Sequence, residues 1–171
     1  MFSGKTDMDT QELADRQAIT DLLHRYCRAV DRLDIPLGHS IWHEDGQADY
    51  GASVYQGPGR GVIDHVCAQH LHTLHHMHQL SNILIALDGD RAGSEAYVLA
   101  TLRMERDGKL LQMSVWSRHI DRWSRRDGRW GIDHRVAVRD FDEIREVTPM
   151  YRHDVGRRDR DDPSYAVLPL G

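Results

Sequence analysis

The chain has 171 residues, with 22 lysines and arginines against 27 aspartates and glutamates, and a formal net charge of -5. This length is typical of one domain with a buried core, and the acidic balance argues against a nucleic acid or an anionic membrane as partner. No stretch of about 18 apolar residues is present, which excludes a membrane span, and the polar start MFSGKTDMDT predicts a cytoplasmic protein.

The first 46 residues predict two helices. A long helix is expected over residues 10–33, because apolar residues recur at helical spacing and Asp9 with Glu12 resembles a capping box. Pro36 suits the first turn of a second, shorter helix. That helix is expected to end near Gly46, and it would carry Leu37, Ile41 and Trp42.

A third helix is predicted over residues 61–74, after a turn at residues 57–59. The stretch 48–56, between the second and third helices, predicts a short strand pair or an irregular extended piece. The third helix would carry its apolar residues on one side: Val62, Ile63, Val66, Cys67 and Leu71.

Long strands are predicted in the second half, over residues 78–87, 91–106, 110–123 and 130–141. Asp107-Gly108 is a hairpin signal between two of them. Along residues 91–106 the apolar side chains share one parity, which is typical of an antiparallel sheet covered on one face. These residues are Ala92, Ala96, Val98, Ala100, Leu102 and Met104. Small side chains on that face either leave room for a cavity or allow close helix packing.

Helices followed by long strands predict an α+β fold, a cone-shaped barrel in which three N-terminal helices pack in a curved antiparallel sheet. The cone would hold an apolar pocket. The expected organisation is a disordered start over residues 1–9, one domain over 10–147, and a C-terminal arm or tail over 148–171.

Two residues on different predicted elements are candidates for acid–base chemistry. Asp31 stands near the end of the first helix, and it is either a solvent-exposed aspartate or a partly desolvated carboxylate that orients a histidine. His78 begins a predicted strand, where it could be the partner of Asp31 or a hydrogen-bonded polar residue without a chemical role. Spacing leaves both alternatives open.

Histidine is over-represented: six of the 12 histidines fall between His65 and His78. His72 with His75 or His76 has helical spacing that could face one metal ion, with Asp64 or His65 as a further ligand. The spacing matches no specific metal motif, so no metal site is expected. Apart from His78, these histidines are expected to be replaceable surface or packing residues.

The last strands carry His119 and Arg139. Most strand arginines face solvent, but an arginine in a pocket could bind a carboxylate, a carbonyl or a leaving oxygen. The chain has no glycine-rich phosphate loop after a strand and no Gly-x-Ser-x-Gly. Hydride transfer with a nicotinamide cofactor is therefore not expected.

A series of motifs resembles the SnoaL-like branch of the nuclear-transport-factor-2-like superfamily. The similarity covers roughly residues 11–145, and the order and spacing of the motifs carry it. The motifs are LHRYCRAVD at 23–31, IW at 41–42 before Asp45, DYG at 49–51, HQLSN at 78–82, DGDRA at 88–92 and RDGRW at 126–130. The resemblance implies the same cone-shaped α+β barrel.

The resemblance also implies roles for individual residues. Dehydratase-like members of this superfamily use an Asp–His dyad, and Asp31 and His78 stand at the matching positions. Bile-acid dehydratases also carry a tyrosine five residues before the aspartate and an arginine late in the last strand, which Tyr26 and Arg139 match. Hexachlorocyclohexane dehydrochlorinase has a lysine in place of Tyr26, and scytalone dehydratase a tyrosine in place of Val30, which argues against both of these reactions.

The leading hypothesis is a cofactor-independent, dehydratase-like lyase for a small hydrophobic cyclic substrate. His78 would remove a proton, Asp31 would fix its tautomer, and Tyr26 and Arg139 would hold a departing or developing oxygen. The residues expected to bind the substrate are Trp42, Tyr50, Asn82 and His119.

Two alternatives remain at this point. One is an isomerase or cyclase of a steroid- or polyketide-like ketone, since enolisation starts both reactions. The other is a non-catalytic ligand-binding or assembly domain. A homo-oligomer, either a trimer or a dimer, is expected because such assemblies are common in the superfamily.

Overall fold

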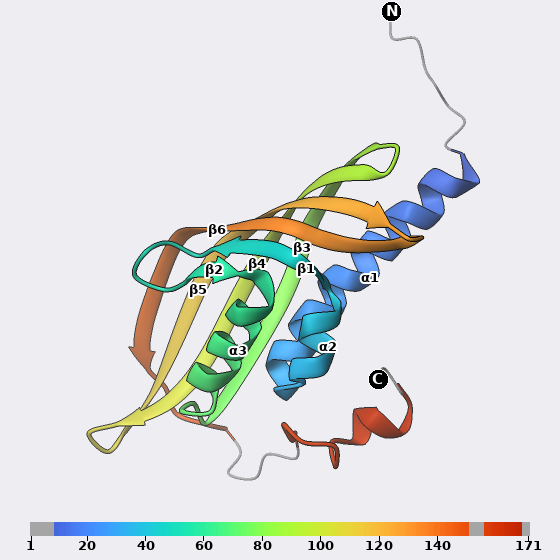
Figure 1. Ribbon diagram of the computed structural model, residues 1–171. Coiled ribbons are helices and arrows are strands. Elements are labelled where there is room, and N and C mark those ends of the chain that lie inside the picture. The colour runs from blue at the N-terminus through green and yellow to red at the C-terminus, as the bar shows by residue number, and fades with distance from the viewer. Residues whose placement is uncertain (1–8, 151–155, 169–171) are drawn as a thin grey trace, which may run out of the picture.

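The structure is a computed structural model that describes residues 9–150 and 156–168 (Figure 1). Its α-helices are α1 (Thr10–Arg32), α2 (Ile35–Ser40) and α3 (Gly59–His70), and a short 3-10 turn, η1, covers Pro163–Ala166. The strands are β1 (Trp42–Asp49), β2 (Gln56–Pro58), β3 (His75–Asp88), β4 (Arg91–Arg106), β5 (Lys109–Arg126) and β6 (Arg129–Glu146). The expected α+β class with three helices is confirmed.

The strands form one sheet in the order β2-β1-β6-β5-β4-β3. β3, β4, β5 and β6 pair antiparallel with one another, as predicted, but β1 runs parallel to β6, so the sheet is mixed. The predicted hairpin at Asp107-Gly108 joins β4 to β5, and both of its residues have a positive φ, which a two-residue turn of this kind requires.

The predicted closure into a barrel is wrong, because within the described residues β2 and β3 are the two open edges of the sheet. The helices cover one face of the sheet in place of further strands. α1 lies along β3, and α3 lies against β1 on the same face (Figure 1). The sheet therefore curves around the helices without closing (Figure 1).

The position of α1 follows from its apolar stripe. Ile19, Leu23, Tyr26 and Val30 are all buried against the sheet. The Asp9 side chain accepts a hydrogen bond from the backbone N–H of Gln11 at 3.2 Å. Asp9 is therefore the N-cap of α1, as the sequence predicts. This stripe holds the end of α1, and with it Asp31, close to β3.

The second helix is shorter than predicted. α2 ends at Ser40, and Trp42 begins β1 with its side chain fully buried. The expected helix to Gly46 is therefore wrong, because the apolar pair Ile41 and Trp42 fits a buried strand as well as a helix. The indole lies against the Cα of Gly59, where any side chain would overlap it.

The alternating pattern of residues 91–106 is confirmed. Ala92, Ala96, Val98 and Leu102 are buried on the helix-facing side of β4. Ala92 and Ala96 belong to the hydrophobic core, whereas Val98 and Leu102 border a cavity. Both consequences of the small side chains thus occur, each in its own half of the strand.

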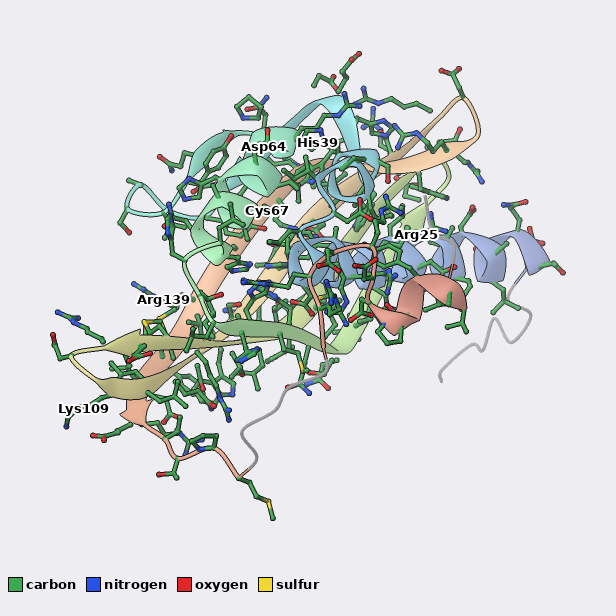
Figure 2. All side chains as sticks on the ribbon, turned by 90° about the horizontal axis from the view of Figure 1, so that it is seen from below. Arg25, His39, Asp64, Cys67, Lys109 and Arg139 are labelled. Carbon is green, nitrogen blue, oxygen red and sulfur yellow. The ribbon has the colours of Figure 1, made fainter. Side chains whose placement is uncertain are left out.

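Of the expected C-terminal arm, residues 148–150 and 156–168 are described, and the second stretch lies beside the C-terminal part of α1 (Figures 1 and 2). The expected disordered start, residues 1–9, falls outside the described part except for Asp9. No helix of the described ranges is both long and apolar enough to span a bilayer.

Candidate active site

A cavity of about 770 Å³ lies between the helices and the curved face of the sheet. Side chains of three neighbouring strands form its apolar wall: Val98, Ala100, Leu102, Met113, Val115 and Ala137. A largely apolar pocket of this volume fits a ligand of drug size, with a few polar groups to orient it. Here those polar groups come from α1, α3, β3, β5 and β6 and from the loop that follows β1.

Asp31 and His78 are in direct contact. The Nδ1 atom of His78 lies 2.7 Å from Oδ1 of Asp31, and the backbone N–H of His78 donates to both carboxylate oxygens at 3.1 Å. Only 8% of the His78 side chain and 14% of the Asp31 side chain are exposed. The predicted pair is thus present in the geometry, and it is largely shielded from solvent.

The two members of the pair face different spaces. His78 borders the cavity, whereas Asp31 borders a separate cleft on the other side of α1. A carboxylate only accepts hydrogen bonds, so Nδ1 of His78 carries the proton that it donates to Asp31. Nε2 is the ring nitrogen that does not contact Asp31, and in a neutral imidazole it is the nitrogen that can act as a base.

Tyr26 and Tyr50 form a second polar point on the cavity wall. Their hydroxyl oxygens are 3.1 Å apart, so one hydroxyl donates to the other and one proton remains for a ligand oxygen. Burial raises the pKa of Tyr26 well above its usual value. Tyr26 therefore stays protonated and acts as a donor at neutral pH.

His119 borders the cavity beside these tyrosines. Its ring lies edge-on to Tyr26 and Tyr50, with centroids 5.1 and 5.8 Å apart. Burial holds its pKa well below the usual range, so the ring is neutral. Its buried Nδ1 atom has no hydrogen-bond partner within the described residues.

Arg135 on β6 is a residue that the sequence analysis missed. Its side chain is 0% exposed and binds Asp121 of β5 through Nε at 2.7 Å and Nη2 at 2.8 Å. Burial opposes the charge on Arg135, but Asp121 holds its pKa well above the usual range. The guanidinium lies 4.4 Å from the centroid of the Tyr26 ring and so supports it from the side of the core.

A parity argument could have found this pair. Asp121 and His119 share the inward parity of β5, and Arg135 shares the inward parity of β6 with Ala137. A charged residue on the buried face of a strand needs a partner, and Asp121 stands opposite Arg135 in the sheet register.

His70 and His76 also pack beside the dyad, and whether these packing residues are replaceable, as the sequence analysis expects, stays a prediction. The His70 ring lies 4.2 Å from that of His76 and 5.2 Å from that of His78. Burial, with the two neighbouring histidines, lowers the pKa of His70 to about 3. Within residues 9–150 and 156–168, no group of three or more potential ligands is placed to hold a metal ion.

The other predicted site residues differ in their positions. Arg139 borders the cavity at its exposed end, where 64% of its side chain is exposed and Nη1 lies 3.4 Å from Asp142 (Figure 2). Trp42 is packed in the core and Asn82 is exposed at a bulge of β3 with φ 50°. Neither Trp42 nor Asn82 is among the described residues that border the cavity.

Comparison with solved structures supports this fold. A putative scytalone dehydratase from Novosphingobium aromaticivorans superposes with a TM-score of 0.69 at 20% identity, over 86% of this chain and 100% of that chain. The hexachlorocyclohexane dehydrochlorinase LinA-type3 from Novosphingobium barchaimii gives a TM-score of 0.67 at 20% identity, over 86% and 99% of the two chains. The Kfla4162 protein from Kribbella flavida gives 0.68 at 19%, over 77% and 94%.

At these identities the solved structures show a shared fold and no more. No curated protein sequence matches the chain. The family comparison is more specific, because residues 11–136 match the SnoaL-like domain. This match extends from α1 to the middle of β6 and covers well over half of the chain. The protein therefore belongs to the SnoaL-like family.

Proposed function

We propose that this protein is a cofactor-independent, dehydratase-like lyase for a small hydrophobic cyclic substrate. The observation that carries the proposal is the 2.7 Å contact between Asp31 and His78, with His78 bordering a mostly apolar cavity. The names of two structurally similar proteins, a putative scytalone dehydratase and a dehydrochlorinase, are those of lyases and agree with it.

His78 acts as the base. Its Nε2 atom takes a proton from a carbon next to a carbonyl group, and the electron pair of that C–H bond forms the new double bond. The hydroxyl group on the next carbon leaves, receives the proton from the imidazolium and departs as water. Asp31 holds the ring in this orientation and stabilises its charged state, because it accepts from Nδ1–H throughout.

The tyrosine pair binds the substrate oxygen on which negative charge develops. Tyr26 and Tyr50 are both part of the cavity wall, and one hydroxyl proton of the pair is free to point at a ligand. A donor that is already oriented in a largely dry pocket stabilises the transition state more than water does. Arg139, which borders the cavity at its exposed end beside Asp142, would hold a departing or developing oxygen of the substrate from that end.

The apolar wall sets the substrate class. The side chains of β4 and β5 offer the ring system hydrophobic contact without hydrogen bonds, and the volume of about 770 Å³ accommodates more than one fused ring. His119, which is neutral and buried, borders the same cavity beside the tyrosines.

A panel of cyclic β-hydroxy ketones, followed by mass spectrometry, tests the proposal. We expect the wild-type protein to form a product lighter by one water molecule, and Asp31→Asn and His78→Gln to reduce the rate by about 10²- to 10⁴-fold. Asp21→Asn on the exposed face of α1 and His72→Gln, also exposed, are matched controls that retain the rate.

Other products would decide against elimination. A product of unchanged mass that depends on His78 supports the isomerase alternative. Full turnover in His78→Gln removes the mechanism altogether.

A further inference from the structure

Residues 156–168, here called the C-terminal segment, lie outside the part of the chain that matches the SnoaL-like domain. The segment packs beside the C-terminal part of α1 in both views (Figures 1 and 2). It contacts α1, which carries Asp31, and the end of α3 with the turn that precedes β3, the strand that carries His78. These contacts are not required by the proposed chemistry, so they need their own explanation.

Arg158 fastens the segment to the end of α3. Its Nη1 atom donates to the backbone oxygen of His70 at 2.8 Å and to that of Thr73 at 3.1 Å. His70 is the last residue of α3, where backbone oxygens lack partners within the helix. A cation at this end also favours the helix dipole, so Arg158 caps α3 from outside the helix.

A chain of hydrogen bonds continues from this cap to α1. The Thr73 hydroxyl lies 2.8 Å from the His70 oxygen and 2.9 Å from Nδ1 of His76. Nε2 of His76 then donates to the backbone oxygen of Val30 at 3.0 Å. Val30 directly precedes Asp31, and His76 stands two residues before His78, so this chain links the backbones on both sides of the dyad.

The segment also holds α1 on both sides of Asp31. Arg28 donates to the Ser164 hydroxyl at 3.0 Å, and its guanidinium lies 4.7 Å from the ring centroid of Tyr165. Nε of Arg32 lies 3.5 Å from Asp162, whose side chain is 6% exposed. Arg28 is one helical turn before Asp31, and Arg32 directly follows it, so rotation or fraying of this turn would have to break both contacts.

We propose that the C-terminal segment positions the Asp31–His78 dyad, with Arg158 as the principal positioning residue. It joins the end of α1 to the α3–β3 turn, and the short dyad contact is the result of that junction. Its catalytic consequence depends on the proposed function, but the geometric claim does not, because the dyad contact exists in the protein without substrate.

The imidazole signals of the substrate-free protein test this directly. With ¹⁵N-labelled histidine, the Nδ1–H proton of His78 gives a resonance that His78→Gln removes, which assigns it. We expect Arg158→Gln to make this proton exchange with water at least about tenfold faster, because the contact opens more often. Ser164→Ala, which removes the Arg28 contact, accelerates exchange as well, and Arg158→Lys restores part of the protection.

Arg157→Gln is the matched control. Arg157 has the same charge and is adjacent to Arg158, but among the described residues its side chain pairs with Asp159 and Asp161, inside the segment. It should leave the His78 resonance and its exchange rate unchanged. If Arg158→Gln lowers stability, the exchange rates of Ser164→Ala and Arg158→Lys still show whether the segment positions the dyad, because both variants keep one end of the segment attached.

Two results would overturn the proposal. One is wild-type exchange in both Arg158→Gln and Ser164→Ala. The other is equal acceleration in Arg157→Gln and Arg158→Gln, which would make the effect one of charge. Since no substrate enters the measurement, neither result bears on whether the protein is a lyase. Once a substrate is known, the proposal predicts a roughly 10- to 100-fold loss in kcat for Arg158→Gln with little change in KM.

Discussion

Asp31 accepts hydrogen bonds from two groups of the same residue, the ring Nδ1–H and the backbone N–H of His78. The backbone contact fixes β3 relative to α1, and the ring contact then fixes the direction of the imidazole. A histidine held in this way loses little freedom when it reacts, because its orientation is set in advance. The relationship couples the packing of α1 on the sheet to the chemistry proposed for the cavity.

Loss of the Tyr26 hydroxyl should reduce activity without disturbing the fold. Tyr26→Phe removes a donor from the cavity and breaks the contact with Tyr50, while the ring stays between Arg135 and the cavity. We expect kcat on the substrate that the ketone panel identifies to fall by about 10²- to 10³-fold. Tyr97→Phe is the control, since Tyr97 is exposed and does not border the cavity. Equal rates for the two variants would contradict the assigned role.

Replacing only one member of the buried Arg135–Asp121 pair should lower the stability of the fold. Arg135→Met leaves a buried, unpaired carboxylate, and Asp121→Leu leaves an unpaired guanidinium, so each should lower the free energy of unfolding by about 3 to 5 kcal/mol. The double variant should recover most of this loss, because neither charge then remains in the core. Urea denaturation of the four proteins measures the coupling. Additive losses in the double variant would contradict it.

Acid should destabilise the protein through its buried histidines. A histidine whose pKa is about 3 when folded but near 6.5 when unfolded favours the folded state fully above pH 6.5. This contribution is lost as the pH falls from 6.5 toward 3, because the unfolded chain takes up a proton that the folded chain excludes. For His70 alone the loss between pH 6.5 and 5 is about 2 kcal/mol.

The comparison of His70→Gln with His72→Gln isolates this effect. Urea denaturation at pH 7.5 and pH 5 should show a smaller loss of stability on acidification for His70→Gln than for the wild type. His72 is exposed, so His72→Gln should lose as much as the wild type. An identical pH dependence in all three proteins would show that His70 is not the group responsible. Burial lowers the pKa of His76 and His119 as well, so His70→Gln should keep part of the acid sensitivity.

The close approach of Trp42 to Gly59 gives a prediction for the fold alone. A Cβ atom at residue 59 would overlap the buried indole, so Gly59→Ala should cost about 1 to 3 kcal/mol of unfolding free energy. Gly93→Ala is the control, because nothing lies within 4 Å of the position that its Cβ would take. Thermal or urea denaturation should separate the two. Equal stability would mean that β1 can shift to make room.

The sequence pattern alone was sufficient to predict the four long strands and α1. The strict alternation in β4 and the Asp-Gly turns depend only on residues that are close in sequence, and the structure shows both. Barrel closure is not a local property, because it depends on whether the edges β2 and β3 can meet once the helices occupy the space between them. The predicted length of α2 was wrong for a related reason. An apolar pair such as Ile41-Trp42 does not distinguish a helix from a buried strand.

The candidate site was predictable where motifs exist and not elsewhere. The proximity of Asp31 and His78 was expected from the family resemblance, and the structure places them in contact, while their role in catalysis stays a prediction. Arg135, His70 and Arg158 carry no motif. Side-chain parity along β5 and β6 could have paired Arg135 with Asp121. The positions of His70 and Arg158 depend instead on which residues face them from distant elements, such as the end of α3 beside the C-terminal segment. Only the three-dimensional packing supplies that information.

The most direct test of the central claim is the exchange of substrate protons with solvent. In D₂O the wild-type protein should introduce deuterium at the carbon next to the carbonyl group of a bound cyclic ketone, because Nε2 of His78 removes that proton whether or not elimination follows. His78→Gln and Asp31→Asn should abolish this exchange, and Asp21→Asn and His72→Gln should retain it. Deuterium incorporation by His78→Gln at the wild-type rate would contradict the account.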